Sequence, residues 1–185
     1  ESSFVDVALG NTLRMERLID DLLELSQAES AGVPLEREEV PLQNFLSRVA
    51  EFYRLPAERA GKTLEVVASE GTLRADVRKL TLAMSNLVDN AIKYGKEGGR
   101  VTVSGKIELS GCTLEVKDDG PGISPEHLPR IFERFYRVDK GRSREVGGTG
   151  LGLSIAKHIV ESHGGVLRVE SRIGVGTRFI LQIPA

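Results

Sequence analysis

Two pairs of alternating apolar and polar runs, each pair joined by a short turn, most restrict the fold of this 185-residue chain. The first pair covers residues 100–107 and 112–117, with a turn at Ser110–Gly111. The second pair covers residues 166–171 and 178–183 around the sequence IGVGT. Alternation with a period of two predicts half-buried strands, and the short connections predict antiparallel hairpins. The chain is therefore expected to form a two-layer α/β sandwich rather than a doubly wound sheet.

Apolar residues at helical spacing predict three helices for the second layer. The first covers Leu42–Ala60, where Pro56 is expected to produce a kink. The second covers Asp76–Tyr94 and begins at an aspartate that can cap it. The third is expected at residues 150–163, closed by the glycine that follows, after a loop that contains a short helix. Further short strands are expected at Glu38–Val40 and at residues 63–67.

The first 30 residues have a different pattern, typical of one long helix. The apolar stripe follows heptad spacing and is wider than a two-stranded seam; it contains Met15, Leu18, Ile19, Leu22, Leu23 and Leu25. Such a helix needs partners to bury its stripe, which favours a helical bundle over a helix packed on its own domain. Residues 31–35 are predicted to be a linker, and residues 36–185 a separate domain.

Composition excludes several classes of function. A net charge of −2 and the lack of a basic stripe argue against nucleic-acid binding. The single cysteine, Cys112, excludes an internal disulfide and is expected to be a small buried side chain. No apolar run reaches the roughly 18 residues that a membrane span needs. Because the first residue is Glu rather than Met, we expect a piece of a longer protein, whose membrane anchoring stays open.

Three polar side chains share one side of the predicted helix at residues 76–94. Asn86, Asn90 and Lys93 are spaced i, i+4 and i+7. An ordinary solvent-facing side would explain them, but asparagine is a poor residue inside a helix. An amide oxygen can complete a Mg²⁺ shell made of phosphate oxygens and water. The stripe is therefore a candidate metal and phosphate site.

The sequence KDDGPGI follows a predicted buried strand. Its Asp, Gly and Pro residues would explain a simple turn. A carboxylate at this strand end could instead accept a hydrogen bond from an exocyclic amine, while the glycines let a flat base approach. Asp118 is expected in that role and Asp119 in solvent, although spacing alone does not separate them.

The sequence GGTGLGLS stands just before the last predicted helix. It fits neither the Walker A loop, because Leu153 stands where the lysine is required, nor the G-x-G-x-x-G motif. Glycines at 148, 150 and 152 would nevertheless expose N–H groups at a helix N-terminus, where the helix dipole favours anions. A glycine-rich hinge is the equally weighted alternative.

Three motifs follow one another along the chain: N-x-x-x-N-A-x-K-Y, D-x-G-x-G and G-T-G-L-G-L, with IFERFYRVD between the last two. In this order they form a specific combination. They resemble the catalytic ATP-binding domain of sensor histidine kinases, in the superfamily that includes gyrase, Hsp90 and MutL. The resemblance covers residues 36–185. Within residues 1–30, RLIDDLLELSQAE is similar to the second helix of the dimerisation and histidine-phosphotransfer domain of these kinases. The ligands that it implies are ATP and Mg²⁺.

The resemblance also implies roles for individual residues. Asn90 would bind Mg²⁺, Asn86 would lie beside the phosphates, and Lys93 would contact phosphate. Asp118 would read the adenine amino group, and Arg137 would neutralise charge on the γ-phosphate during transfer. The other implied nucleotide contacts are Tyr94, Gly120, Gly122, Ile123, Phe135, Tyr136, Gly148, Thr149, Gly150, Leu151, Gly152, Leu153 and Thr177.

Three further regions match the family pattern. Phe132 belongs with Phe135 and Tyr136 to an aromatic box. Residues 139–149 would form a mobile lid over ATP. The final glycine motif would contain Gly174, Gly176 and Thr177 and support the base pocket.

The family's phosphate acceptor is a histidine followed by Glu or Asp on another helix, and none of the three histidines here has that context. His127 lies between prolines; His158 and His163 point about 140° apart on one helix and cannot form a metal pair. His163 is expected to be structural. The chain is therefore expected to bind ATP without phosphorylating itself.

The implied partners are a histidine-bearing dimerisation helix of the same protein, a second copy of that protein, and the receiver domain of a response regulator. The domain would work in the cytoplasm. At Asn86, many ATP-hydrolysing relatives have a glutamate that activates water, and an amide cannot act as that base. This favours a kinase over an ATP-hydrolysing clamp; a degenerate ATP-binding scaffold is the second alternative.

Overall fold

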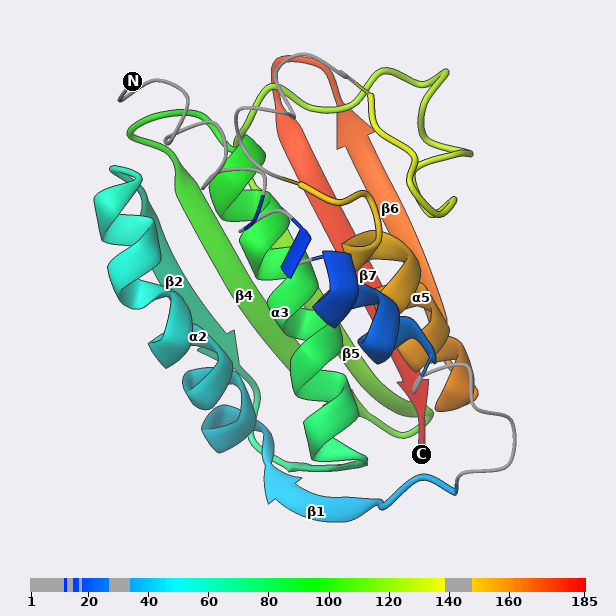
Figure 1. Ribbon diagram of the computed structural model, residues 1–185. Helices are drawn as coiled ribbons and strands as arrows, with labels where there is room; N and C mark the ends of the chain where they lie inside the picture. Colours follow the sequence, from blue (N-terminus) through cyan, green and yellow to red (C-terminus); the bar gives the residue numbers. More distant parts are fainter. Residues whose placement is uncertain (1–11, 13–14, 17, 27–33, 139–147) are drawn as a thin grey trace, which may run out of the picture.

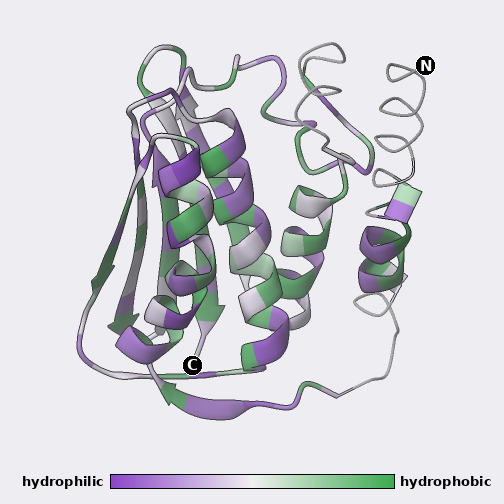
Figure 2. Cartoon of the chain, turned by 60° about the vertical axis from the view of Figure 1, so that its left-hand side comes forward, coloured by the Kyte–Doolittle hydropathy of each residue, from purple (hydrophilic) through white to green (hydrophobic). Residues whose placement is uncertain are grey.

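The computed structural model describes residues 12, 15–16, 18–26, 34–138 and 148–185. Figure 1 shows a sheet with helices stacked on one face, and the side view in Figure 2 separates these two layers. The helices are α2 (Leu42–Arg59), α3 (Val77–Tyr94) and α5 (Gly152–Ser162). The predicted two-layer α/β sandwich is therefore confirmed.

The main sheet has the strand order β2-β4-β5-β7-β6. These strands are β2 (Thr63–Ala68), β4 (Arg100–Glu108), β5 (Gly111–Asp118), β6 (Val166–Arg172) and β7 (Gly176–Pro184). β2 and β4 are parallel, and the other neighbours are antiparallel. Both predicted hairpins, β4–β5 and β6–β7, are present. β7 pairs with β5, so the glycine motif that begins β7 lies beside the end of β5.

The core lies between the sheet and the helical layer. On the sheet side, Val116 is paired with Val103 on one neighbouring strand and with Phe179 on the other. On the helix side, the apolar stripe of α3 is buried and includes Leu80, Ala83, Met84, Leu87, Val88 and Ala91. Cys112 is 5% exposed, and burial raises the pKa of its thiol to about 12. The thiol is therefore protonated and inert, as the sequence predicted.

The helix ends follow the predicted capping. Asp76 accepts a hydrogen bond from the Lys79 N–H at 3.1 Å and so caps α3. At the end of α5, Gly164 has φ +76° and its N–H bonds to the carbonyl of Glu161. This is the glycine closure that the sequence predicted.

A small second sheet contains one strand that the sequence analysis predicted, β1, and one that it missed, β3. β3 (Thr72–Ala75) pairs antiparallel with β1 (Glu38–Pro41), and the side chains of Leu73 and Ala75 are buried. β3 has only four residues, two of them with buried side chains, so its alternation is too short to recognise in the sequence. β3 therefore depends on a partner far away in the chain, which its own short pattern does not reveal.

The short helix expected between β5 and α5 had no stated bounds, and the described part of that loop contains no helix. Residues 124–133 form successive turns rather than a helix, with the His127 and Arg130 N–H groups bonding back three residues. Pro125 and Pro129 lack the N–H groups that a continuous helix needs. The rest of the loop, residues 139–147, lies outside the described residues, and so does most of the predicted lid.

The N-terminal helix lies on the outer side of the helical layer (Figures 1 and 2). Its described part includes residues 18–26, and Leu25 is only 5% exposed because it packs on the domain core. Within the described ranges, every helix is too short or too polar to cross a lipid bilayer.

Candidate functional site

A cavity of about 520 Å³ lies between α3, the loop after β5, residues 131–138 and the glycine run before α5. Most residues predicted for the site line it: Asn86, Asn90, Lys93, Tyr94, Asp118, Gly122, Ile123, Tyr136, Arg137, Gly148, Thr149, Gly150, Gly152, Leu153 and Thr177. Gly120, Phe135 and Leu151 are the predicted residues that do not line it. The three separate motifs therefore meet at one place.

The polar stripe of α3 forms one wall of the cavity. The Asn86 Nδ2 donates to the Leu82 carbonyl at 3.1 Å, which leaves the amide oxygen turned toward the glycine run. A Cβ atom at Gly152 would lie 2.6 Å from this oxygen. A side chain at this position would therefore require the Asn86 amide to move. Lys93, two turns further along α3, forms an ion pair with Asp89.

Asp118 forms the inner end of the cavity. Its side chain is 8% exposed at the end of β5, and its Oδ1 accepts a hydrogen bond from the Gly120 N–H at 2.8 Å. Burial raises the pKa of Asp118, and hydrogen bonds from the Gly120 and Thr177 N–H groups act in the opposite direction. Asp119 instead accepts a hydrogen bond from the Arg100 N–H at 2.9 Å and does not line the cavity. The structure thus separates two aspartates that spacing could not.

The turn after Asp118 depends on a glycine. Gly122 has φ +74°, and a Cβ atom there would lie 2.2 Å from the carbonyl oxygen of Arg172. A side chain at this position would push the turn away from the end of β6. Gly120, which does not line the cavity, contributes through its hydrogen bond to Asp118.

The glycine run places the N-terminus of α5 at the cavity. α5 has no acidic residue in its first turn and no side-chain cap, so its first N–H groups are available to an anion. Leu151 is fully buried and fixes this end of the helix in the core, whereas Leu153 lines the cavity. Thr149 Oγ1 accepts a hydrogen bond from the Leu151 N–H at 3.3 Å. The run is thus held by contacts at both Thr149 and Leu151.

Arg137 brings two unsatisfied hydrogen-bond donors into the site. Its Nε and Nη2 atoms are buried and have no hydrogen-bond partner among the described residues. Leaving buried donors of a cation unpaired is costly, so the arrangement favours an anion in the cavity. Because Arg137 lines the same cavity as Asn90, Lys93 and Gly152, that anion would be held from several sides.

The aromatic residues of the loop have different surroundings. Phe132 packs edge-on against Phe179 with ring centroids 6.4 Å apart, and Tyr136 lines the cavity. Phe135 points outward and is 57% exposed. Its contribution is made by the backbone, because its N–H bonds to the Gly150 carbonyl at 2.9 Å.

The cavity also contains residues that the sequence analysis missed: Asp21, Asp89, Ala91, Pro121, Ile131, Val138 and Phe179. Asp21 belongs to the N-terminal helix and accepts a hydrogen bond from the Thr149 hydroxyl. Asp21 is not part of the apolar heptad stripe or of any motif, so the sequence did not indicate this contact. Phe179 could have been found, since it is an inward residue of β7 and is paired with Val116 beside Asp118.

The three histidines stand apart from the cavity. His163 is 1% exposed; its Nδ1–H donates to the Ile159 carbonyl at 2.8 Å, and its Nε2 accepts from the Asp76 N–H at 3.1 Å. The predicted structural role of His163 is therefore confirmed. His127 bonds through Nδ1 to the Tyr136 hydroxyl at 2.8 Å.

The oxygen atoms of the cavity suit a metal ion that is held mainly by the phosphate groups of a bound nucleotide. Among the described residues, no group of three or more His, Cys, Asp or Glu side chains could enclose a metal. The amide oxygens of Asn86 and Asn90 could supply the one or two protein ligands that Mg²⁺ takes beside phosphate oxygens and water.

Comparisons with known proteins agree with this geometry. The sequence profile of the histidine kinase-, DNA gyrase B-, and HSP90-like ATPases matches residues 75–185. The chain is 36% identical to the sensor protein SrrB of Staphylococcus aureus over 179 residues, which are 96% of this chain and 31% of SrrB. The chain thus spans about a third of the length of the curated relatives it matches.

Solved structures give the same result. Full-length ShkA in complex with AMPPNP superposes with a TM-score of 0.85 at 28% identity, covering 100% of this chain and 38% of ShkA. The mycobacterial sensor histidine kinase MprB has a TM-score of 0.67 at 33% identity, covering 80% of this chain and 97% of MprB. The chain belongs to the histidine kinase-, DNA gyrase B- and HSP90-like ATPase family and carries the catalytic ATP-binding domain of a histidine kinase.

Proposed function

We propose that the chain binds ATP with Mg²⁺ in the cavity and that, within a longer sensor kinase, it transfers the γ-phosphoryl group to a histidine. The observation that carries this proposal is that two buried guanidinium nitrogens of Arg137, Nε and Nη2, lack a hydrogen-bond partner among the described residues, in the same cavity as the N-terminus of α5. A polyphosphate would satisfy both groups, because each favours an anion.

Recognition of the base would fall to Asp118. The Asp118 carboxylate accepts hydrogen bonds from the Gly120 and Thr177 N–H groups, and its remaining lone pairs can accept one from the amino group of adenine. Ile123, Ile131 and Phe179 also line the cavity and would supply apolar surface for the ring. This combination favours adenine over guanine, whose corresponding group is a carbonyl.

Asn90, with Asn86 one turn earlier, would hold Mg²⁺ together with phosphate oxygens. When bound, Mg²⁺ would neutralise charge on the phosphate groups. Lys93 is placed to contact phosphate after leaving its ion pair with Asp89. Arg137 would stabilise charge on the γ-phosphate as it leaves ATP, which makes Arg137 and Asn86 the candidate catalytic residues.

Phosphotransfer fits the site better than hydrolysis. The Asn86 amide donates its hydrogen to the Leu82 carbonyl and cannot remove a proton from water. A histidine acceptor brings its own nucleophilic nitrogen and needs no such base. The sensor protein SrrB, which this chain resembles, supports a role in sensing and signalling.

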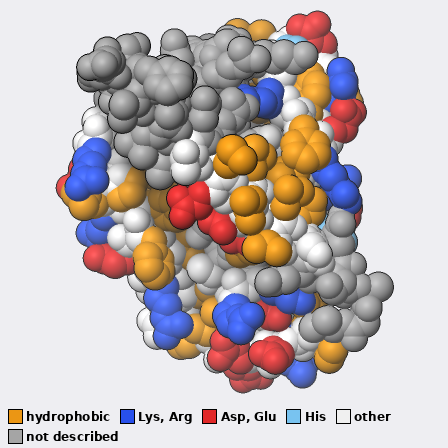
Figure 3. Space-filling view, in the orientation of Figure 1, with side chains coloured by type: hydrophobic (Ala, Val, Ile, Leu, Met, Phe, Trp, Pro, Cys, Tyr) orange, Lys and Arg blue, Asp and Glu red, His pale blue; other side chains and the backbone are white. Residues whose placement is uncertain are grey.

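The N-terminal helix would meet a histidine-bearing helix and a second copy of the protein. Figure 3 shows hydrophobic side chains gathered over this helix. They belong to Met15, Ile19, Leu22 and Leu23, which are between 47% and 63% exposed. A stripe of this kind is buried when helices pack in a bundle. The proposed onward acceptor is the receiver domain of a response regulator, in the cytoplasm where ATP is available.

Labelling with γ-³²P-ATP and Mg²⁺ tests the proposal. An N-terminally extended form of the protein that includes a His-Glu or His-Asp motif should acquire acid-labile, base-stable label. Residues 1–185 alone should stay unlabelled. Arg137→Ala in the extended form should abolish the label, while Arg168→Ala, on the outer face of β6, should not.

Two results would contradict this function. Label on residues 1–185 alone would mean that one of their own histidines accepts phosphate. Steady release of inorganic phosphate by the extended form, without any protein-bound label, would instead indicate an ATP-hydrolysing enzyme.

A further inference from the structure

Tyr136 lines the cavity and is held by two residues that lie outside it. Its hydroxyl lies 2.8 Å from Nδ1 of His127, and one of these two atoms donates to the other. The guanidinium carbon of Arg130 lies 4.4 Å from the centroid of its ring. His127 and Arg130 do not line the cavity. The hydroxyl of Tyr136 is therefore held by His127, and one face of its ring is held by Arg130.

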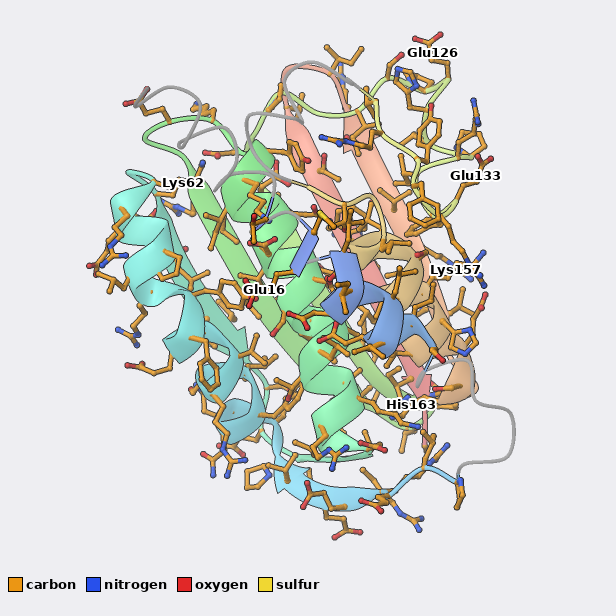
Figure 4. All side chains as sticks on the ribbon, viewed as in Figure 1. Glu16, Lys62, Glu126, Glu133, Lys157 and His163 are labelled. Atoms are coloured by element: carbon orange, nitrogen blue, oxygen red, sulfur yellow. The ribbon has the colours of Figure 1, made fainter. Side chains whose placement is uncertain are left out.

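Arg130 is itself held in position. Its Nε and Nη2 donate to the carboxylate of Glu133 at 3.1–3.2 Å in a forked arrangement. Both partners are about half exposed, so the pair adds little stability by itself. Figure 4 shows Glu133, with Glu126, at the outer edge of this loop. The pair instead fixes the plane of the guanidinium over the tyrosine ring.

The backbone at Phe135, next to Tyr136, has an unfavourable conformation and is hydrogen-bonded to the glycine run. Phe135 is the non-glycine residue with positive φ, +62°, in the described part of the chain. Such a conformation is unfavourable for a bulky residue and persists only where its surroundings impose it. Here the Phe135 N–H bonds to the Gly150 carbonyl at 2.9 Å. Tyr136 and Arg137 consequently enter the cavity as consecutive residues beside the glycine run.

We propose that His127 and Arg130 are positioning residues for the nucleotide, a role that rests on the proposed function. They hold the Tyr136 ring as a preformed wall of the cavity. Through the adjoining peptide they keep the Arg137 guanidinium at the phosphate end. The benefit is preorganisation, since a ring and a guanidinium already in place do not have to be ordered when ATP binds.

The proposal predicts a coupled effect on affinity. Freeing one ordered side chain should weaken binding of Mg²⁺–AMPPNP by about 2- to 10-fold. His127→Ala and Tyr136→Phe remove the two ends of the same hydrogen bond. Each should therefore weaken binding, and the double variant should be no weaker than the poorer single variant. His127→Asn, which restores a polar atom near the position of Nδ1, should recover most of the affinity.

The experiment is isothermal titration of residues 1–185 with Mg²⁺–AMPPNP, with thermal unfolding of every variant measured alongside. Arg130→Ala should weaken binding to a similar extent. Arg168→Ala is the matched loss of an arginine on the opposite face of the sheet and should bind as the wild type does.

The outcomes separate the two proposals. If the wild-type chain binds AMPPNP and His127→Ala and Arg130→Ala bind equally well, the positioning role is refuted and the nucleotide site stands. Additive losses in the double variant, or losses that follow thermal stability and are not rescued by His127→Asn, would also refute it. If the wild-type chain does not bind AMPPNP at all, the proposed function fails and takes the positioning role with it.

Discussion

At the scale of single residues, the site is defined by hydrogen-bond donors that have no acceptor among the described residues. The guanidinium of Arg137 has two buried donors without a partner among the described residues, and the first N–H groups of α5 have no side-chain cap. The two buried donors of Arg137 are costly when unpaired, and a polyanion would satisfy both them and the N–H groups of α5. Charge that is buried and unpaired is thus the strongest local indication of a ligand.

Arg137→Ala should weaken ATP binding by about 10- to 100-fold, because a hydrogen bond to a charged group contributes about 1.5–3 kcal/mol. Adenosine, which has no phosphates, should bind the variant and the wild type equally. Competition titrations with the two ligands measure the difference. Equal losses for ATP and adenosine would place Arg137 at the base rather than at the phosphates.

His163 gives the molecule a pH dependence that is separate from the site. Burial lowers the pKa of His163, with hydrogen bonding to the Ile159 carbonyl acting in the opposite direction. The neutral ring accepts the Asp76 N–H, and protonation would set two N–H groups against each other. Below the unfolded pKa of about 6.5, the unfolded chain binds more protons, so stability is complete above that pH and falls as pH decreases.

Urea unfolding between pH 7.5 and pH 5.5 should therefore show a larger loss of stability for the wild type than for His163→Gln. The difference between the two curves isolates this one group from the carboxylates. Parallel curves would show that His163 does not titrate in this range.

At the scale of elements, two helices and one strand meet at the cavity because their ends are fixed by specific contacts. α3 approaches α5 through Asn86 and Gly152, and the end of β5 carries Asp118. The N-terminal helix adds a third contact, since Asp21 accepts a hydrogen bond from Thr149. The Asp21 carboxylate thus lines the cavity that we assign to a polyanion, where its negative charge would repel the ligand.

Asp21→Asn should tighten ATP binding by about 2- to 5-fold, because removing a partly exposed charge near the phosphates is worth about 0.5–1 kcal/mol. Asp20→Asn is the matched control, since Asp20 is exposed and does not line the cavity. Titration of both variants at low and high salt measures the effect, which should shrink as salt rises. Weaker binding by Asp21→Asn would mean that Asp21 supports the site instead.

Periodicity was enough to predict the elements with long, regular patterns. The hairpins, the three helices and the Asp76 cap are present, because each depends on local alternation, spacing or capping chemistry. β3 was missed because its stability comes from a distant partner, β1. The positive φ of Phe135 was also beyond prediction, since it is imposed by the contact with Gly150.

At the scale of the whole molecule, the sandwich brings three distant motifs to one cavity. The sequence order of the motifs was specific enough to predict the family and most of the residues that line the site. It could not give the contribution of Asp21, which depends on how the N-terminal helix lies over the helical layer (Figure 1). The exposed stripe of that helix gives the chain a second surface, away from the cavity, for the proposed helical partner.

The most direct test of the account is calorimetric titration of residues 1–185 with ATP and with GTP, each with and without Mg²⁺. ATP should bind with assistance from Mg²⁺, and GTP should bind at least about tenfold more weakly, because guanine offers a carbonyl to the Asp118 carboxylate. Asp118→Asn should lose both affinity and discrimination, whereas Asp119→Asn, outside the cavity, should keep both. Absence of ATP binding, or equal binding of ATP and GTP that is indifferent to Asp118→Asn, would contradict the assignment of this cavity.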